Sequence, residues 1–146
     1  ERLPAYIPIE INIGCPNVSS IVISDEEIIA FSKKFFDISI KVSPNTKISY
    51  IEKLWGLGIR KFHLSNTQPI QTYGVSGYPL KRVNLPFMES VAKLNLKYTR
   101  LIAGGGIYTP QDVIDYHNAG ATDYSLSTIF FTPWKVPKVI KRIKRL

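Results

Sequence analysis

Residues 100–128 read RLIAGGGIYTPQDVIDYHNAGATDYSLST, and this stretch decides the fold class. It begins with a short apolar run, Arg100–Ala103, and ends with a second one, Asp123–Leu126. Between them, Thr109 is followed directly by Pro110, and Asp112 lies three residues after Thr109. This spacing is the pattern of a helix N-terminus. Asn118–Gly120 is a typical glycine stop for that helix. A strand, a helix and a second strand in this order predict a parallel βαβ unit.

The same alternation extends over the whole chain, with no repeat or linker to divide it. The predicted strands are Ile7–Ile13, Ile38–Val42, Lys61–Leu64, Arg100–Ala103 and Asp123–Leu126. The predicted helices are Asp25–Phe36, Ile48–Leu57, Leu85–Leu94, Thr109–Asn118 and the basic tail Lys135–Leu146. One long connection, Ser65–Val83, is predicted to be a functional loop because compact domains rarely contain loops of that length. The sequence therefore predicts one parallel α/β domain over residues 1–146.

Composition excludes several classes of protein. A single cysteine among 146 residues rules out a disulfide framework and a multi-cysteine metal cluster. No apolar run approaches the roughly 18 residues of a membrane span. The net charge of +8 is concentrated in Lys135–Leu146, which holds six basic residues and no acid. We interpret that tail as an amphipathic helix with a solvated basic face, and binding to nucleic acid or to another anionic surface is the alternative.

Polar and glycine residues cluster directly after each predicted strand. The clusters are Asn12–Asn17, Lys41 with Ser43, Ser65–Thr67, Gly104–Gly106 and Ser127–Thr128. Because the carboxyl ends of parallel strands meet at one face, that face is expected to bind a ligand.

The last two units predict a phosphate site. Gly104–Gly106 lets backbone N–H groups approach an anion, and the helix that begins at Thr109 is expected to add its positive end. Ser127 and Thr128 supply hydroxyl groups one unit later. A purely structural turn is the alternative interpretation of the three glycines.

Cys15 lies in a tight turn beside asparagines, where it is either a small buried apolar residue or a nucleophile or proton acceptor. His63 and His117 are interpreted as structural, so a Cys–His pair is disfavoured and proton abstraction from a bound substrate remains. The side chain of Lys41 is either a surface group or a cation that stabilises negative charge on a cofactor ring. Paired amides at Asn12, Asn17 and Asn66 suit a planar polar ligand.

Several motifs then occur in one order along nearly the whole chain. They are Ile11–Asn17 (INIGCPN), Lys41–Pro44 (KVSP), Ser65–Thr67 (SNT), Gly74–Lys81 (GVSGYPLK), Ala103–Ile107 (AGGGI), Gly120–Thr122 and Ser127–Thr128. This set resembles the C-terminal portion of the dihydroorotate dehydrogenase family, FMN-dependent (β/α)8-barrel enzymes of pyrimidine (UMP) biosynthesis. The INIGCPN motif alone is also similar to tRNA-dihydrouridine synthases, whereas the GVSGYPLK stretch is specific to the dehydrogenase.

The resemblance implies a role for each matching residue. Cys15 matches the base that removes a C5 proton from dihydroorotate while a hydride passes to the flavin. A cysteine here is typical of the soluble class 1 enzymes, because the membrane-associated class 2 enzymes use serine. The substrate-binding residues would be Asn12, Asn17, Asn66 and Thr67. The residues that bind FMN would be Lys41, Asn66, Gly77, Gly105, Gly106, Ser127 and Thr128.

The resemblance also implies a cytoplasmic enzyme that is a homodimer at full length, with no membrane or nucleic-acid partner. Three departures from the family pattern are Tyr73-Gly74 for Gly-Gly, Ser127-Thr128 for Gly-Thr, and a short segment after Asn17. A closed barrel needs eight βα units and about 250 residues, so five strands cannot close one. We therefore expect a partial TIM barrel, about the last five units, from a longer enzyme, although completion by another chain is an alternative. The electron acceptor is left open, as are two other functions: another FMN-dependent pyrimidine oxidoreductase and a non-catalytic remnant.

Overall fold

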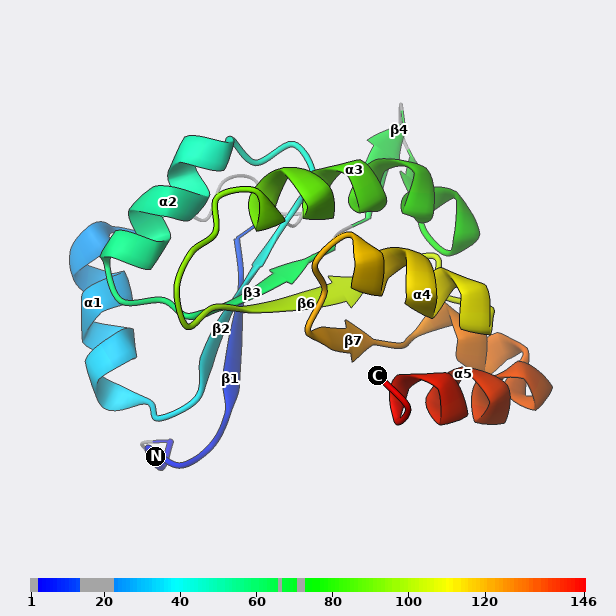
Figure 1. The fold of residues 1–146 in the computed structure, drawn as a ribbon. Coiled ribbons are helices and arrows are strands. Elements are labelled where there is room, and N and C mark those ends of the chain that lie inside the picture. Colours follow the sequence, from blue (N-terminus) through cyan, green and yellow to red (C-terminus); the bar gives the residue numbers. More distant parts are fainter. Residues whose placement is uncertain (1–2, 14–22, 66, 71–72) are drawn as a thin grey trace.

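The protein is described by a computed structural model that covers residues 3–13, 23–65, 67–70 and 73–146 (Figure 1). Five parallel strands form the main sheet in the spatial order β1-β2-β3-β6-β7. Their bounds are β1 Ile9–Asn12, β2 Ile38–Val42, β3 Lys61–Leu64, β6 Arg100–Gly104 and β7 Asp123–Ser125. Each strand lies within a residue or a few residues of its predicted range, so the predicted parallel α/β fold is confirmed.

Five α-helices connect and follow these strands. Their bounds are α1 Asp25–Lys34, α2 Ile48–Gly56, α3 Lys81–Ala92, α4 Pro110–Asn118 and α5 Val136–Ile143. Local chemistry sets their ends, as at α1, where the Ser24 hydroxyl accepts a hydrogen bond from the Glu27 backbone N–H at 3.2 Å. The Glu27 carboxylate accepts in return from the Ser24 N–H at 2.9 Å, which completes a capping box. None of the described helices is long and apolar enough to cross a bilayer.

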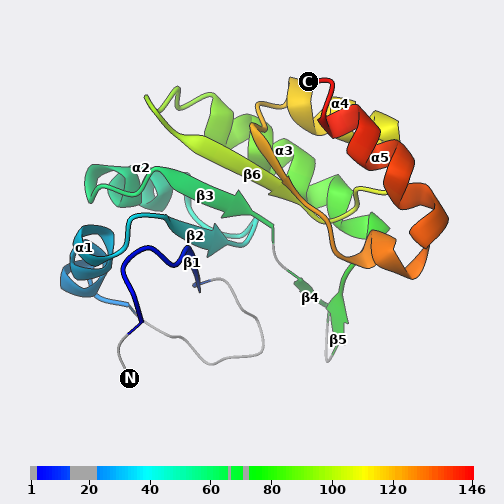
Figure 2. The same cartoon turned by 90° about the horizontal axis from the view of Figure 1, so that it is seen from below.

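The winding of the chain distinguishes a barrel segment from an open doubly wound sheet. Neighbouring strands follow one another in chain order, with no reversal. Figure 2 shows the five helices along one side of a curved sheet. In the described sheet, β1 and β7 are the edge strands. This is the arrangement of consecutive units of a (β/α)8 barrel.

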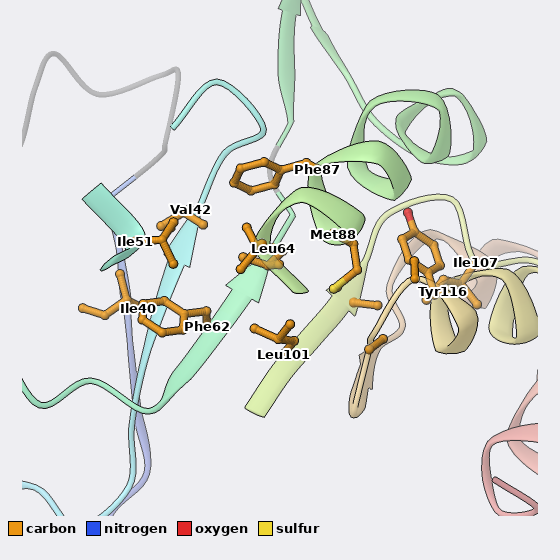
Figure 3. Packing of buried hydrophobic residues seen from close by; sticks show 14 of the residues in the cluster. Ile40, Val42, Ile51, Phe62, Leu64, Phe87, Met88, Leu101, Ile107 and Tyr116 are labelled. Atoms are coloured by element: carbon orange, nitrogen blue, oxygen red, sulfur yellow. The ribbon is translucent and has the colours of Figure 1, made fainter. Parts of the chain in front are cut away.

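The core lies between the sheet and this layer of helices. Alternate residues of β2 and β3, among them Ile40, Phe62 and Leu64, are completely buried. Figure 3 shows these side chains packed with Ile51 of α2 and Met88 of α3. Because successive strand residues point to opposite faces, the intervening residues project away from the core toward the barrel interior. They are polar or charged at several positions, including Glu10, Lys41 and His63.

Two predicted boundaries are wrong. The stretch Ser65–Val83 is not one loop, because β4 (Gln68–Ile70) and β5 (Tyr73–Val75) pair there as an antiparallel hairpin beyond the ends of β3 and β6 (Figure 2). A 3-10 turn, η1 (Tyr78–Leu80), then leads directly into α3, which begins at Lys81 rather than Leu85. Pro86 lies inside that helix, one residue after the predicted start.

The first helix is also shorter than predicted. It ends at Lys34, because Phe35 leaves the helical conformation with φ −106° and ψ 130°. Phe35 itself is buried, and Phe36 beyond it is almost fully exposed. The predicted helix was therefore two residues too long, because the apolar residues Phe35 and Phe36 follow the helix end.

Candidate functional site

The carboxyl ends of the central strands meet at a small cavity of about 130 Å³. Its walls come from strands β2, β3 and β7, from the residues that directly follow β3, β6 and β7, and from η1 with the turn before it. The lining residues are Lys41, His63, Ser65, Thr67, Ser76, Gly77, Leu80, Gly105, Ser125, Ser127 and Thr128. The cavity therefore lies on the face where the strand-end clusters predicted a ligand site.

Most of the described candidate residues meet at this cavity. Five of those expected to bind the cofactor line it, together with one expected to bind substrate: Lys41, Gly77, Gly105, Ser127, Thr128 and Thr67. Asn12 ends β1 and pairs in register with Lys41 on β2, but it does not line the cavity. Cys15, Asn17 and Asn66 lie outside the described residues.

Gly106 is placed differently from the other expected cofactor residues. It has φ +78°, and an added Cβ would lie 2.9 Å from the Lys81 backbone nitrogen and 2.9 Å from the Tyr78 carbonyl oxygen. Its α-carbon therefore packs against the start of α3. The structure gives this glycine a packing role, and it is not among the residues that line the cavity.

Two buried side chains hold the glycine turn after β6. The Asn84 amide donates to the Gly104 carbonyl at 2.9 Å, and the Tyr116 hydroxyl donates to the Gly105 carbonyl at 2.8 Å. Burial raises the pKa of Tyr116, so its hydroxyl stays protonated and remains a donor. These contacts fix the direction of the turn from α3 and α4. Neither residue was predicted from the sequence, although a polar Asn84 on the apolar face of a helix is a signal.

The expected contribution of the α4 N-terminus to a phosphate site is wrong. The Asp112 carboxylate accepts hydrogen bonds from the N–H groups of Tyr108 at 3.0 Å and Thr109 at 2.8 Å. The Thr109 hydroxyl accepts from the Asp112 N–H at 3.2 Å, which completes a capping box. The described residues that line the cavity include none from α4. The protein's own carboxylate thus occupies this helix end.

An ion-pair cluster fixes the start of α3 against α4. The Lys81 ammonium contacts the carboxylates of both Asp112 and Asp115. Burial raises the pKa of Asp112, but the ammonium and the N–H groups of Tyr108 and Thr109 outweigh that effect and lower it overall. The hydrogen bond from Lys81 also lowers the pKa of Asp115. This cluster holds the backbone that Gly106 contacts.

The groups around the cavity suit the binding of an anion. Ser127 and Thr128 offer hydroxyls, Lys41 offers a cation, and Gly105 has φ +76°, a conformation that favours glycine. Pockets that enclose a whole drug-sized ligand measure about 300–1,000 Å³. At about 130 Å³ the cavity fits a phosphate and the adjoining part of a cofactor, but not all of FMN.

A model of the dihydroorotate dehydrogenase family matches residues 4–146. The chain belongs to the dihydroorotate dehydrogenase family. The catalytic subunit of dihydroorotate dehydrogenase B (NAD(+)) from Bacillus mycoides is 29% identical over 176 residues, covering 100% of this chain and 55% of the relative. The corresponding subunit from Enterococcus faecalis is 32% identical over 178 residues, which cover 99% of this chain and 55% of that subunit.

Solved structures agree on the fold. DHODH from Eimeria tenella in complex with ferulenol has a TM-score of 0.72 at 18% identity, covering 92% of this chain and 48% of that one. The ligand-free form has a TM-score of 0.75 at 19% identity, and the match covers 93% of this chain and 50% of that one. The chain spans about half the length of the curated dihydroorotate dehydrogenases it matches. The alignment with the Bacillus subunit covers 176 positions against 146 residues here, so the relative has residues in the matched region without a counterpart.

Proposed function

We propose that this chain forms the FMN-binding wall of a dihydroorotate dehydrogenase that oxidises dihydroorotate to orotate in pyrimidine biosynthesis. The supporting observation is the cavity in which Lys41, Gly105, Ser127 and Thr128 meet, in a chain that belongs to this family. The hydroxyls of Ser127 and Thr128 and the backbone at Gly105 suit a phosphate monoester, and the Lys41 cation suits a group that gains negative charge. FMN fits that chemistry at its phosphate end.

The described residues of the cavity would bind different parts of FMN. Ser127, Thr128 and Gly105 hold the phosphate end, and Lys41, two strands away from β6, lies toward the ring end. Bound FMN would supply the hydride acceptor for the oxidation of dihydroorotate, which would lose a hydride from C6. The Lys41 ammonium stabilises the negative charge that this transfer brings to the site.

The substrate residues follow from the family resemblance. Cys15, as a thiolate, removes the C5 proton of dihydroorotate, while Asn12, Asn17, Asn66 and Thr67 bind the pyrimidine ring and its carboxylate. Amide groups suit this task because they offer a paired donor and acceptor to a planar imide. The enzyme is of the class 1 type, with cysteine as its base, and acts as a cytoplasmic homodimer.

The first test is a titration of FMN with the purified chain, followed by quenching of flavin fluorescence. We expect FMN to bind more tightly than riboflavin, which lacks the phosphate. Lys41→Ala should weaken FMN binding by about tenfold, the size of one hydrogen bond to a charged group. Lys33→Ala, at an exposed lysine of α1, is the matched control. Equal binding of FMN and riboflavin, or equal losses in the two variants, would contradict the proposal.

The second test addresses the base in a full-length enzyme with this sequence. Cys15→Ala should retain yellow FMN and abolish orotate formation, whereas loss of the flavin would contradict the assignment of Cys15 as base. Orotate should also perturb the flavin spectrum of the unaltered enzyme. Salt-sensitive binding of tRNA, without any response to orotate, would instead favour the tRNA-directed alternative.

A further inference from the structure

His63 is a buried titratable residue to which neither the family resemblance nor the proposed reaction gives a role. It lies on β3 and is 5% exposed, and its imidazole lines the cavity from the barrel interior. Its Nδ1 lies 2.9 Å from Oε2 of Glu10, two strands away on β1. Among the residues that the structure describes, its Nε2 is buried without a hydrogen-bond partner.

His63 lines the cavity, and its Nε2 lies against Gly104 at the end of β6. A Cβ added to Gly104 would lie 2.7 Å from Nε2 and 3.0 Å from the Ser65 Cβ. Glycine at this position therefore gives the imidazole its space at the end of β6. A buried nitrogen without a partner costs free energy unless a ligand or water satisfies it.

The contact with Glu10 determines which nitrogen has the proton. The hydrogen bond from His63 is the largest influence on the pKa of Glu10 and lowers it, and the Lys41 charge acts in the same direction against partial burial. Glu10 is therefore a carboxylate at neutral pH and can only accept. Nδ1 must donate to it, which leaves the Nε2 of a neutral imidazole with a free lone pair.

The strand order indicates which part of a cofactor would reach this nitrogen. Gly105, Ser127 and Thr128 follow β6 and β7, whereas Lys41 belongs to β2. β3 lies between β2 and β6, and His63 is in register with Lys41 on one side and Ile102 on the other. In FMN, the segment between the phosphate and the ring is the ribityl chain, whose hydroxyls are hydrogen-bond donors.

We propose that His63 is a ligand-binding residue whose Nε2 accepts a hydrogen bond from a ribityl hydroxyl of the flavin, and that Glu10 is the positioning residue that fixes the required tautomer. This inference rests on the proposed function, because it requires a flavin in the cavity. It adds a contact from the barrel interior, below the strand ends.

The test is nitrogen NMR of the full chain labelled with 15N-histidine, which gives signals from only two residues, His63 and His117. The free protein should show the neutral His63 imidazole protonated at Nδ1, which faces Glu10, and bare at Nε2. FMN and riboflavin should shift the His63 Nε2 signal, and lumiflavin, which has no ribityl chain, should not. The His117 signals are the internal control, because that residue is exposed at the end of α4.

The outcomes separate this inference from the proposed function on which it rests. If, in a second and uniformly 15N-labelled sample, FMN shifts the backbone amides of Gly105 and Thr128, but does not shift His63 Nε2, the inference is overturned and the flavin site stands. A shift with lumiflavin as large as with FMN also overturns it, because the contact would be to the ring. If FMN shifts none of these signals, the flavin site fails and the inference fails with it. An Nε2-protonated tautomer in the free protein overturns the role given to Glu10.

A variant adds a measure of the contact. His63→Phe keeps a ring in the same space and removes both nitrogens, and it should weaken FMN binding by about 3- to 10-fold, the effect of one neutral hydrogen bond. His117→Phe is the matched control and should bind FMN normally. Lumiflavin affinity should be the same in both variants, and an equal loss for lumiflavin in His63→Phe would contradict the ribityl contact.

Discussion

Replacement of Gly106 by alanine tests the packing role that the structure gives this glycine. The residue has φ +78°, and an added Cβ would lie 2.8 Å from Lys81 Cβ, 2.9 Å from the Lys81 nitrogen and 2.9 Å from the Tyr78 oxygen. Two of these three atoms belong to the backbone, so a side-chain rotation cannot relieve the overlap. The backbone at the start of α3 is itself tied to α4 by the ion pairs of Lys81.

The expected loss of stability has two parts. Left-handed backbone costs a non-glycine residue about 1–2 kcal/mol, and overpacking of a close contact costs about 1–3 kcal/mol more. Gly106→Ala should therefore lower the free energy of unfolding by about 2–5 kcal/mol. In a domain of this size each kcal/mol corresponds to about 2–4 °C, so Tm should fall by roughly 4–20 °C. Urea denaturation and thermal unfolding followed by far-UV circular dichroism measure both quantities.

Gly56→Ala is the matched control, because the same substitution at that position should raise the free energy of unfolding instead of lowering it. Gly56 lies in α2, and an added Cβ would meet no atom within 4 Å. Alanine is favoured over glycine in a helix by about 0.5–1 kcal/mol, so this variant should be more stable than the wild type. If Gly106→Ala unfolds within about 0.5 kcal/mol of the wild type, the change expected of an unconstrained surface site, the packing argument is refuted.

Two further predictions concern the same part of the fold. Thr109→Ala removes the α4 capping hydroxyl and should cost about 1 kcal/mol in urea denaturation, and a loss no larger than that of Thr99→Ala would contradict the cap's contribution. Lys81→Met should destabilise the protein in a pH-dependent manner, because Lys81 lowers the folded-state pKa values of Asp112 and Asp115 from their ordinary 3.8. A carboxylate with a lowered folded-state pKa stabilises the fold above its unfolded value, and that contribution is lost as the pH falls through the folded value. The wild-type advantage over Lys81→Met should thus be full at neutral pH and shrink below about 3.8; a pH-independent difference between their unfolding free energies would contradict this.

Much of the fold could be predicted from local signals. The β-branched run Ile38–Val42 and the cap at Thr109 each determine an element through their own chemistry, and the structure has both where they were expected. The region after Ser65 could not be predicted in the same way. Its hairpin is short, and Pro86 inside α3 has the local signature of a helix start although the tertiary packing extends that helix to Lys81.

Some features of the candidate site could be predicted from the sequence, and others could not. Strand-end positions placed Lys41, Ser127 and Thr128 on one face, because parallel strands carry their carboxyl ends to the same edge. Nothing in the sequence showed that Gly106 packs against the start of α3, or that Lys81 pairs with Asp112 and Asp115 of α4. His63 was interpreted as structural because a histidine in the middle of a strand gives no local indication of which polar groups surround it.

The sequence by itself determined the order of strands and helices and the face on which a ligand site would form. Both follow from short-range physics, since hydrophobic periodicity, caps and glycine stops act within one or two turns of the chain. Only the tertiary structure decided the partners of the buried polar groups. The contact of His63 with Glu10 joins residues 53 positions apart, and that of Lys81 with Asp112 joins residues 31 apart. Such pairs form because the sheet and its helices bring distant residues together in an interior where each buried polar atom requires a partner.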